Sequence, residues 1–299
     1  MTYTPTRPAT SVFLTVRGLR QHALHWPGQG RPLVLLHGWM DVAASFQFLV
    51  DALNTEQPVW ALDWRGYGQS AWSGQDAYWF YDYLGDLDAW LDHIAPGTAV
   101  DLVGHSMGAN AATLYAGVRP ARVQTLVNLE GFGLPDMPAT QAPDRLARWL
   151  DALREPTQLA PYPDQAAVAA RLQRNNPRLT PDRAAWLAGQ WSAEREDGRR
   201  VLCADPAHKR PHAQLYRSSE VLACWARIQA PTLFVEGEDD SLAAYWGAHF
   251  PRAELDARLA HIPRLERTRL MGTGHMLHHD DPEGLANVLQ AFWEGVKPR

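Results

Sequence analysis

The chain carries Gly104-His105-Ser106-Met107-Gly108 between two segments with different side-chain patterns. Residues 99–103 (Ala-Val-Asp-Leu-Val) form a short apolar, β-branched run that predicts a buried strand. Residues 109–116 are rich in small side chains and predict a helix. Strand, sharp turn and helix are the context in which a G-x-S-x-G pattern exposes a reactive serine above a sheet. Ser106 is therefore the predicted nucleophile.

The two glycines of this pattern let neighbouring backbone approach a turn that holds Ser106 in a strained conformation. The serine oxygen then lies at the N-terminus of a helix, whose dipole favours developing negative charge. A chance Gly-x-Ser-x-Gly turn is the alternative interpretation. The strand and helix patterns on either side argue against it.

A serine that attacks a carbonyl needs two N–H donors for the oxyanion that forms. One donor is the backbone of the following residue, Met107. The second comes from an early strand–helix loop, and residues 33–36 (Leu-Val-Leu-Leu) predict a buried strand that ends in His37-Gly38-Trp39. We therefore expect the Trp39 backbone to supply the second donor.

Four motifs follow one another along the chain: His37-Gly38-Trp39, Asp63-x-Arg65-Gly66-x-Gly68-x-Ser70, Gly104-His105-Ser106-Met107-Gly108 and Gly272-x-Gly274-His275. In these motifs the chain resembles the α/β-hydrolase superfamily. The similarity is to its lid-bearing branch, with epoxide hydrolases, haloalkane dehalogenases, cofactor-free haloperoxidases and small-molecule esterases. The resemblance implies a mostly parallel central sheet, helices on both of its faces and an inserted helical lid.

The partner histidine has to come late in the chain, because the order in this fold is serine, acid, histidine. His275 follows the strand-like residues 265–270 and precedes a helix with apolar residues at helical spacing from 285 to 296. We predict that it is the general base. We expect His37 to brace its loop by hydrogen bonding, and His278 and His279 to be surface or rim residues.

Two carboxylates compete for the role of the acid that orients His275. Asp240 follows the strand-like residues 232–235, at the position that most of the family uses. Glu130 ends the run 126–129, where some haloalkane dehalogenases place their acid. Both strands end on the catalytic face, so either side chain could reach the ring. We favour Asp240, with Glu130 as the alternative and Asp239 as a lesser one.

The residue at the nucleophile position limits the reactions that the chain could catalyse. Dehalogenases and epoxide hydrolases of this branch use aspartate at the elbow, whereas this chain has Ser106. A serine favours acyl transfer through an acyl-enzyme, and we expect hydrolysis of a small-molecule carboxylic ester. A perhydrolase (haloperoxidase) or a C–C bond hydrolase would use the same residues. A slow or non-catalytic ligand-binding sensor on this fold is the alternative from another class.

The composition is that of an ordinary globular protein. The 299 residues are 46% hydrophobic and 20% charged, with a net charge of −5 that gives no reason to expect nucleic acid. No apolar run has the length that spans a bilayer, and the polar opening residues lack a signal-peptide core. Cys203 and Cys224 give no disulfide framework. We expect a cytoplasmic enzyme, with a homodimer left open.

Strands and helices alternate along the chain after an opening hairpin at 13–16 and 22–26. From 134 to 229 the strand signals vanish, and helices are expected within 145–153, 165–173 and 182–191. We predict a core of 1–133 and 230–299 and a lid of 134–229, the segment that should select the substrate. Among 13 tryptophans, Trp39 is expected to line an apolar pocket with one lid tryptophan, and His105 to contact substrate.

Cys203, His208, His212 and Cys224 are the candidate ligands of a zinc site. Structural zinc sites more often contain a closely spaced cysteine pair, and Pro206 and Pro211 disturb a helix that would align the histidines. We therefore predict no metal and no cofactor. The expected partner is a small-molecule substrate with an apolar acyl or alkyl part, and a second copy of the chain is possible.

Overall fold

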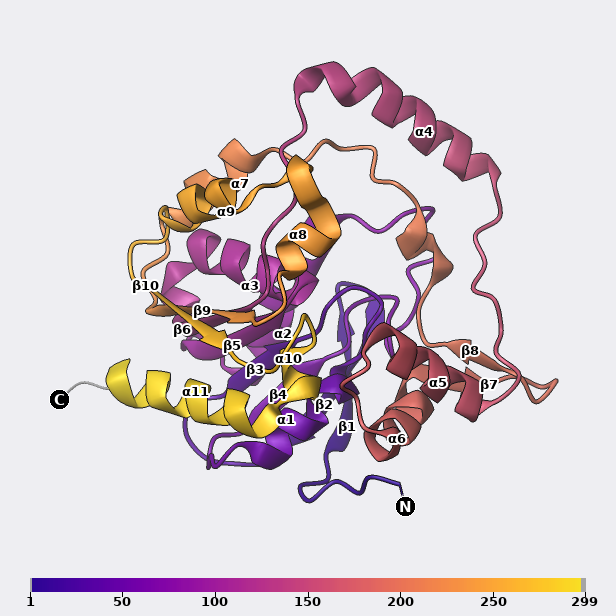
Figure 1. Ribbon diagram of the computed structural model, residues 1–299, viewed down its shortest axis with the longest axis horizontal. Helices are drawn as coiled ribbons and strands as arrows, with labels where there is room; N and C mark the ends of the chain where they lie inside the picture. The colour runs from indigo at the N-terminus through magenta and orange to yellow at the C-terminus, as the bar shows by residue number, and fades with distance from the viewer. Residues whose placement is uncertain (1, 297–299) are drawn as a thin grey trace.

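The computed structural model describes residues 2–296. Eight strands form one sheet that is covered by helices (Figure 1). In spatial order they are β1 (Thr10–Val16), β2 (Leu19–Trp26), β4 (Val59–Leu62), β3 (Leu33–Leu36), β5 (Val100–His105), β6 (Val123–Leu129), β9 (Thr232–Gly237) and β10 (Leu265–Leu270). The pairs β1–β2 and β2–β4 are antiparallel, and all the others are parallel. The mostly parallel sheet that the resemblance implies is confirmed.

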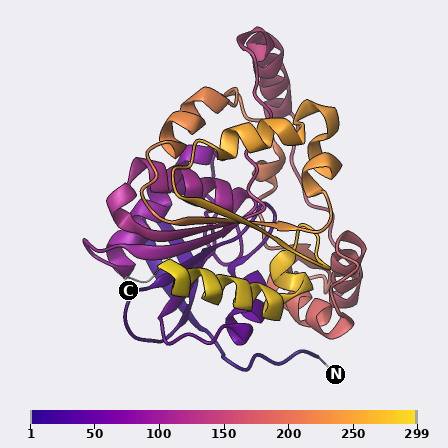
Figure 2. The same cartoon turned by 60° about the vertical axis from the view of Figure 1, so that its left-hand side comes forward.

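The strands β3, β5 and β9 are buried along their whole length, as expected where helices cover both faces of a parallel sheet. Side chains alternate along β3: Leu33 and Leu35 pack with α1 (Gln47–Ala52) and α11 (Pro282–Val296), whereas Val34 and Leu36 belong to the apolar cluster that contains α2 (Phe80–Ile94) and α3 (Met107–Val118). Figure 2 shows the yellow α11 on one side of the sheet and the orange helices on the other. These two layers hold the carboxyl ends of the parallel strands in fixed positions.

The remaining helices of the core are short. They are α8 (Ser241–Trp246), α9 (Arg252–Leu259), α10 (Leu277–Asp280), and the 3₁₀ turns η1 (Ala43–Phe46), η2 (Pro120–Arg122) and η5 (Gly247–His249). Because the parallel strands all end at one edge, the loops after β3, β5, β6, β9 and β10 lie together there. This edge carries every residue expected to be catalytic.

The segment 134–229 lies between β6 and β9 and adds no strand to the eight-stranded sheet. It contains η3 (Ala139–Gln141), α4 (Ala142–Arg154), α5 (Gln165–Asn175), α6 (Pro181–Trp191), η4 (Pro206–Lys209) and α7 (Ser218–Trp225). The three expected helices are confirmed as α4, α5 and α6. A small hairpin of β7 (Ser192–Glu194) and β8 (Arg200–Leu202) was missed. Strands of three residues are too short to show a period of two.

Two parts of this segment differ in their contact with the core. Helices α5 and α6 bury Val168 and Leu187 in a cluster with Phe48 of α1. Helix α4 buries none of its residues and stands apart from the body of the molecule (Figure 1). The segment is also tied to the loop after β9, because Arg178 and Asp239 form an ion pair of 2.7 Å.

None of the helices between residues 2 and 296 is both long enough and apolar enough to cross a bilayer. Cys203 and Cys224 are both free thiols.

Candidate active site

Ser106 occupies a strained turn between β5 and α3. Its φ of 51° and ψ of −114° lie where non-glycine residues are rare. A Cβ on Gly104 would lie 2.5 Å from the backbone nitrogen of Ala109, and one on Gly108 would lie 2.1 Å from the carbonyl oxygen of Leu36. The first glycine thus lets α3 fold back on β5, and the second lets α3 pack against the end of β3.

The loop after β3 passes beside the nucleophile. A Cβ on Gly38 would lie 3.2 Å from the Cβ of Ser106, so the backbone leading into Trp39 runs next to the serine. Met107 begins α3, and the first N–H groups of a helix have no acceptor within it. The Trp39 side chain is 53% exposed, at the edge where the strands end.

His37 fixes the conformation of this loop, as expected. Its buried ring donates from Nδ1 to the carbonyl of Gly38 at 2.8 Å and accepts at Nε2 from the backbone N–H of Trp64 at 3.2 Å. Burial lowers the pKa of His37, which keeps the ring neutral and able to accept. The Trp64 indole donates to the His37 carbonyl at 2.9 Å.

His275 is hydrogen-bonded to Glu130. The ring Nδ1 lies 2.9 Å from Oε2 of the carboxylate, and Glu130 is only 2% exposed. The other oxygen, Oε1, accepts from the backbone N–H of Gly237 at 2.7 Å. Glu130 itself has a positive φ of 56°, which turns its side chain off the end of β6. Both carboxylate oxygens are therefore occupied by fixed donors.

Asp240 does not contact the histidine, and our preference for it over Glu130 is corrected. It caps the N-terminus of α8 by accepting from the backbone N–H of Ala243 at 3.0 Å, and it pairs with Arg252 at 3.0 Å. These partners, the Ala243 N–H first, lower the pKa of Asp240, whose side chain is 55% exposed. The lesser alternative, Asp239, is held by Arg178.

Two further contacts to the His275 loop were not predicted from the sequence. A Cβ on Gly237 would lie 2.6 Å from the carbonyl oxygen of Gly274, so the end of β9 approaches this loop too closely for a side chain. The Tyr245 ring meets the His275 ring edge-on at 4.9 Å and is 60% exposed. Tyr245 lies on α8, which has no motif that would single it out.

His105 supports the same loop from below. It is 2% exposed, and its Nε2 donates to the backbone carbonyl of His275 at 2.8 Å. Burial and the neighbouring His275 hold the pKa of His105 well below its usual value. The expectation that His105 contacts substrate is corrected, because its ring is covered and its hydrogen bond goes to the loop.

Residues 31–282 match the family described as alpha/beta hydrolase fold. The chain belongs to this family. A serine hydrolase-like protein of Danio rerio is 22% identical over 283 residues, which are 91% of this chain and 84% of that protein. An N-formylmaleamate deformylase of Pseudomonas putida is 27% identical over 278 residues, 91% of each chain. The thioesterase domain from the curacin biosynthetic pathway superposes with a TM-score of 0.83 at 25% identity, over 95% of this chain and 99% of that domain.

Two histidines of this alpha/beta hydrolase lie where the sequence did not place them. His278 and His279 on α10 are 0% and 2% exposed, so the expectation of surface or rim positions is wrong. The His278 ring packs 4.6 Å from that of His105. Adjacent histidines at a helix start have no hydrophobic period that would reveal their burial, which depends on the packing of α10 against η1 and α1.

His208, one of the candidate zinc ligands, packs between aromatic rings in this hydrolase. Its ring stacks on Tyr67 at 3.8 Å and on Tyr78 at 3.7 Å. Burial lowers the pKa of His208 to about 3. Stacking between the two tyrosine rings accounts for the burial of His208 without a metal ion.

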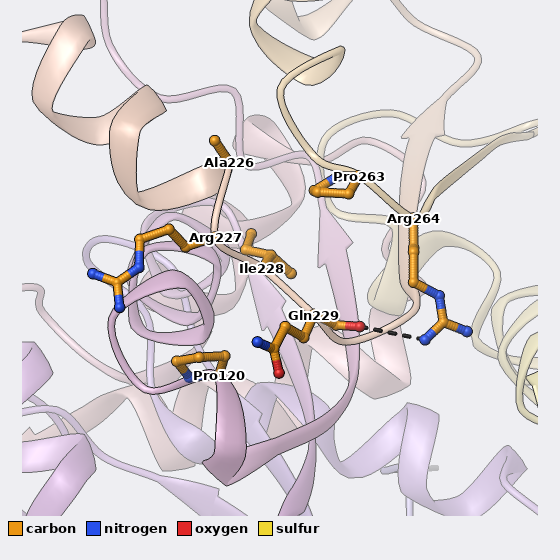
Figure 3. Close-up of a pocket in the computed structure, with 7 residues that line it drawn as sticks. All are labelled: Pro120, Ala226, Arg227, Ile228, Gln229, Pro263 and Arg264. Carbon is orange, nitrogen blue, oxygen red and sulfur yellow. Dashed lines mark hydrogen bonds between the residues drawn. The ribbon is translucent and has the colours of Figure 1, made fainter.

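The hydrolase also has a hollow of about 470 Å³ at the edge of the sheet where the parallel strands begin, opposite the edge that carries Ser106. Its lining residues precede β6, β9 and β10, and Arg264 there donates to the Gln229 carbonyl at 3.3 Å (Figure 3). They are Pro120, Ala226, Arg227, Ile228, Gln229, Pro263 and Arg264. The set contains no nucleophile and no histidine, so it offers no catalytic group.

Proposed function

We propose that this alpha/beta hydrolase cleaves small-molecule carboxylic esters with a triad of Ser106, His275 and Glu130. The observation that supports the triad best is the hydrogen bond between His275 Nδ1 and the buried Glu130 carboxylate. An Nδ1–H that donates to a carboxylate leaves Nε2 unprotonated, which is the tautomer that a general base requires. The fixed donor from Gly237 to the other oxygen keeps this carboxylate in place.

In the first half-reaction His275 Nε2 takes the hydroxyl proton of Ser106 while the serine oxygen attacks the ester carbonyl. The oxyanion is stabilised by the backbone N–H groups of Met107 and Trp39. When the tetrahedral intermediate collapses, the C–O bond to the alcohol breaks, and the alcohol leaves with the proton from His275. The acyl group remains on Ser106.

In the second half-reaction His275 takes a proton from water, and the resulting hydroxide attacks the acyl carbon. Collapse of this intermediate breaks the bond to Ser106 and returns the proton to its oxygen. The carboxylic acid is released and the enzyme is restored. These two half-reactions need no electron carrier and no metal, because every proton moves between His275, Ser106, the alcohol and water.

The segment 134–229 is the proposed lid, and the substrate is proposed to carry an apolar acyl or alkyl part. The exposed aromatic side chains of Trp39 and Tyr245 at the sheet edge support this, because aromatic rings offer apolar contact area near the reacting groups. A cytoplasmic location and a homodimer stay predictions from the sequence alone.

The names of the relatives widen the range of acyl substrates to be tested. One relative is named as a deformylase and one structural neighbour as a thioesterase. Amides, thioesters and esters all present a carbonyl to a serine, so the same triad would serve each. We favour an ester because an alcohol is a better leaving group than an amine, so the C–O bond breaks with less assistance from the enzyme.

The test is labelling with a fluorophosphonate, read by intact mass, followed by hydrolysis of graded acyl esters, a thioester and an N-formyl amide. Wild type should gain one adduct and turn over at least one ester series. Ser106→Ala should do neither, whereas the matched control Ser219→Ala should behave as wild type. An adduct without turnover of any substrate would favour the alternative, a slow or non-catalytic ligand-binding sensor. No adduct on wild type would overturn the proposed nucleophile.

A further inference from the structure

Asp41, His278 and His279 lie together in the interior, next to the proposed active site. Each offers one ligand atom, and these atoms lie within 4.8 Å of one another. The three residues are 3%, 0% and 2% exposed. Asp41 lies in the loop after β3, and the two histidines lie on α10, which is packed against η1 and α1 (Figure 1).

The polar atoms of this cluster lack partners. Asp41 Oδ2, both ring nitrogens of His278 and His279 Nε2 are buried and make no hydrogen bond with any part of the chain from residue 2 to 296. A buried polar atom without a partner is destabilising, and natural proteins contain few of them. Four such atoms in one place indicate that the site holds something else.

We propose that Asp41, His278 and His279 bind a divalent transition-metal ion, with Zn²⁺ the best fit. The gap of 3.9 Å between His278 Nε2 and Asp41 Oδ2 is too long for a hydrogen bond. Two ligands of a tetrahedral Zn²⁺ with bonds of about 2 Å lie about 3.3 Å apart, so a bound ion would draw these two atoms together by about 0.6 Å. The ligand atoms all lie within 4.8 Å of one another, so the widest gap would close by at most about 1.5 Å on binding.

The donor set favours this class of metal. Two imidazoles and one carboxylate suit Zn²⁺, Ni²⁺ or Cu²⁺, whereas Mg²⁺ and Ca²⁺ prefer oxygen ligands. Three protein ligands leave one coordination position for water or another small ligand. A water molecule alone is the competing occupant, and the experiment below separates the two.

The surroundings orient the ligands as they do in metal sites. Asp41 Oδ1 accepts from the Trp191 indole at 2.7 Å, from the backbone N–H of Val42 at 2.8 Å and from the Ser45 hydroxyl. These donors leave Oδ2 as the free oxygen. Ligating carboxylates are commonly held in this way by further hydrogen bonds.

The site would connect the two loops that carry the proposed catalytic groups. Asp41 lies two positions after Trp39, and His278 lies three positions after His275. The His278 ring also contacts His105, whose Nε2 donates to the His275 carbonyl. A bound ion would hold these loops together, so we expect it to raise the melting temperature of the protein.

The experiment uses the full chain, stripped with a chelator, reloaded with Zn²⁺ and then desalted to remove unbound metal. Wild type should retain one Zn²⁺ per chain by elemental analysis. Its melting temperature should rise with Zn²⁺ and stay unchanged with Mg²⁺. Co²⁺ should give the visible absorption of a tetrahedral site. Asp41→Asn, His278→Gln and His279→Gln should each lose retention and the Co²⁺ spectrum. The exposed His261→Ala is the matched control and should keep both.

The wild-type result decides the proposal even if a variant fails to fold, which circular dichroism would show. Wild type that retains no Zn²⁺ and shows no Co²⁺ spectrum would overturn it in favour of a buried water. Retention that survives His278→Gln and His279→Gln in folded protein would overturn it too. Labelling of Ser106 is read separately, so failure of the metal site leaves the proposed hydrolysis untouched.

Discussion

Glu130 and His275 are 145 positions apart in the chain, and their side chains are joined by a hydrogen bond of 2.9 Å between Oε2 and Nδ1. Glu130 follows β6 and His275 follows β10, while the strand between them, β9, supplies the Gly237 N–H to the second carboxylate oxygen. Three strand ends thus fix one carboxylate, and the histidine takes its orientation from it.

Replacing Glu130 by glutamine should lower kcat by about 10³- to 10⁴-fold, because an amide can hold the wrong tautomer of His275 and cannot stabilise its cation. Asp240→Asn is the matched control, since it removes a carboxylate that contacts only Ala243 and Arg252. It should keep kcat within about twofold, as expected for an exposed ion pair. Steady-state kinetics on the best ester measures both, and a reversed ranking would restore Asp240 as the acid.

Gly237→Ala should impair catalysis by displacing the His275 loop. The added Cβ would lie 2.6 Å from the Gly274 carbonyl, a backbone atom that must move. We expect a loss of about 1–3 kcal/mol in the free energy of unfolding and a fall in kcat larger than the change in KM. Urea denaturation and kinetics measure the two effects.

The control for this variant is Gly295→Ala in α11, where a Cβ would meet nothing within 4 Å. It should stabilise the helix by about 0.5–1 kcal/mol and leave kcat unchanged. Equal behaviour of the two glycine variants would contradict the close approach of β9 to the His275 loop.

Stability should fall as the pH drops below about 6.5, the ordinary pKa of histidine. The pKa of His208 is lowered by burial to about 3 in the folded protein. The unfolded chain then binds a proton at this residue between about pH 6.5 and pH 3, where the folded chain does not. Its contribution is therefore complete above pH 6.5 and is lost with acidification, at up to about 1.4 kcal/mol per pH unit.

His208→Phe tests this, because phenylalanine can occupy the stack between Tyr67 and Tyr78 without titrating. The free energy of unfolding, measured in urea at pH 7, 6 and 5, should decline less steeply for the variant than for wild type. Identical slopes would show that another group carries the acid sensitivity.

The local elements around Ser106 were predictable from the sequence. The apolar run before Ser106, the glycines around it and the small side chains after it predict strand, turn and helix, and the structure has β5, the strained turn and α3 there. These features depend on short-range sterics and hydrophobic period, which neighbouring residues determine. The bracing role of His37 is equally local, since its ring bonds the next residue's carbonyl.

The partner of His275 was decided by tertiary structure alone. Glu130 and Asp240 each follow a strand that ends at the same edge, so their positions along the chain give both similar access. The difference arises from the turn at Glu130, with its positive φ, and from the helix cap and arginine that hold Asp240 elsewhere. Likewise, the burial of His278 and His279 against Asp41 follows from the packing of α10 on η1 and α1. Contacts between residues distant in sequence depend on the packing of whole elements, which no local pattern encodes.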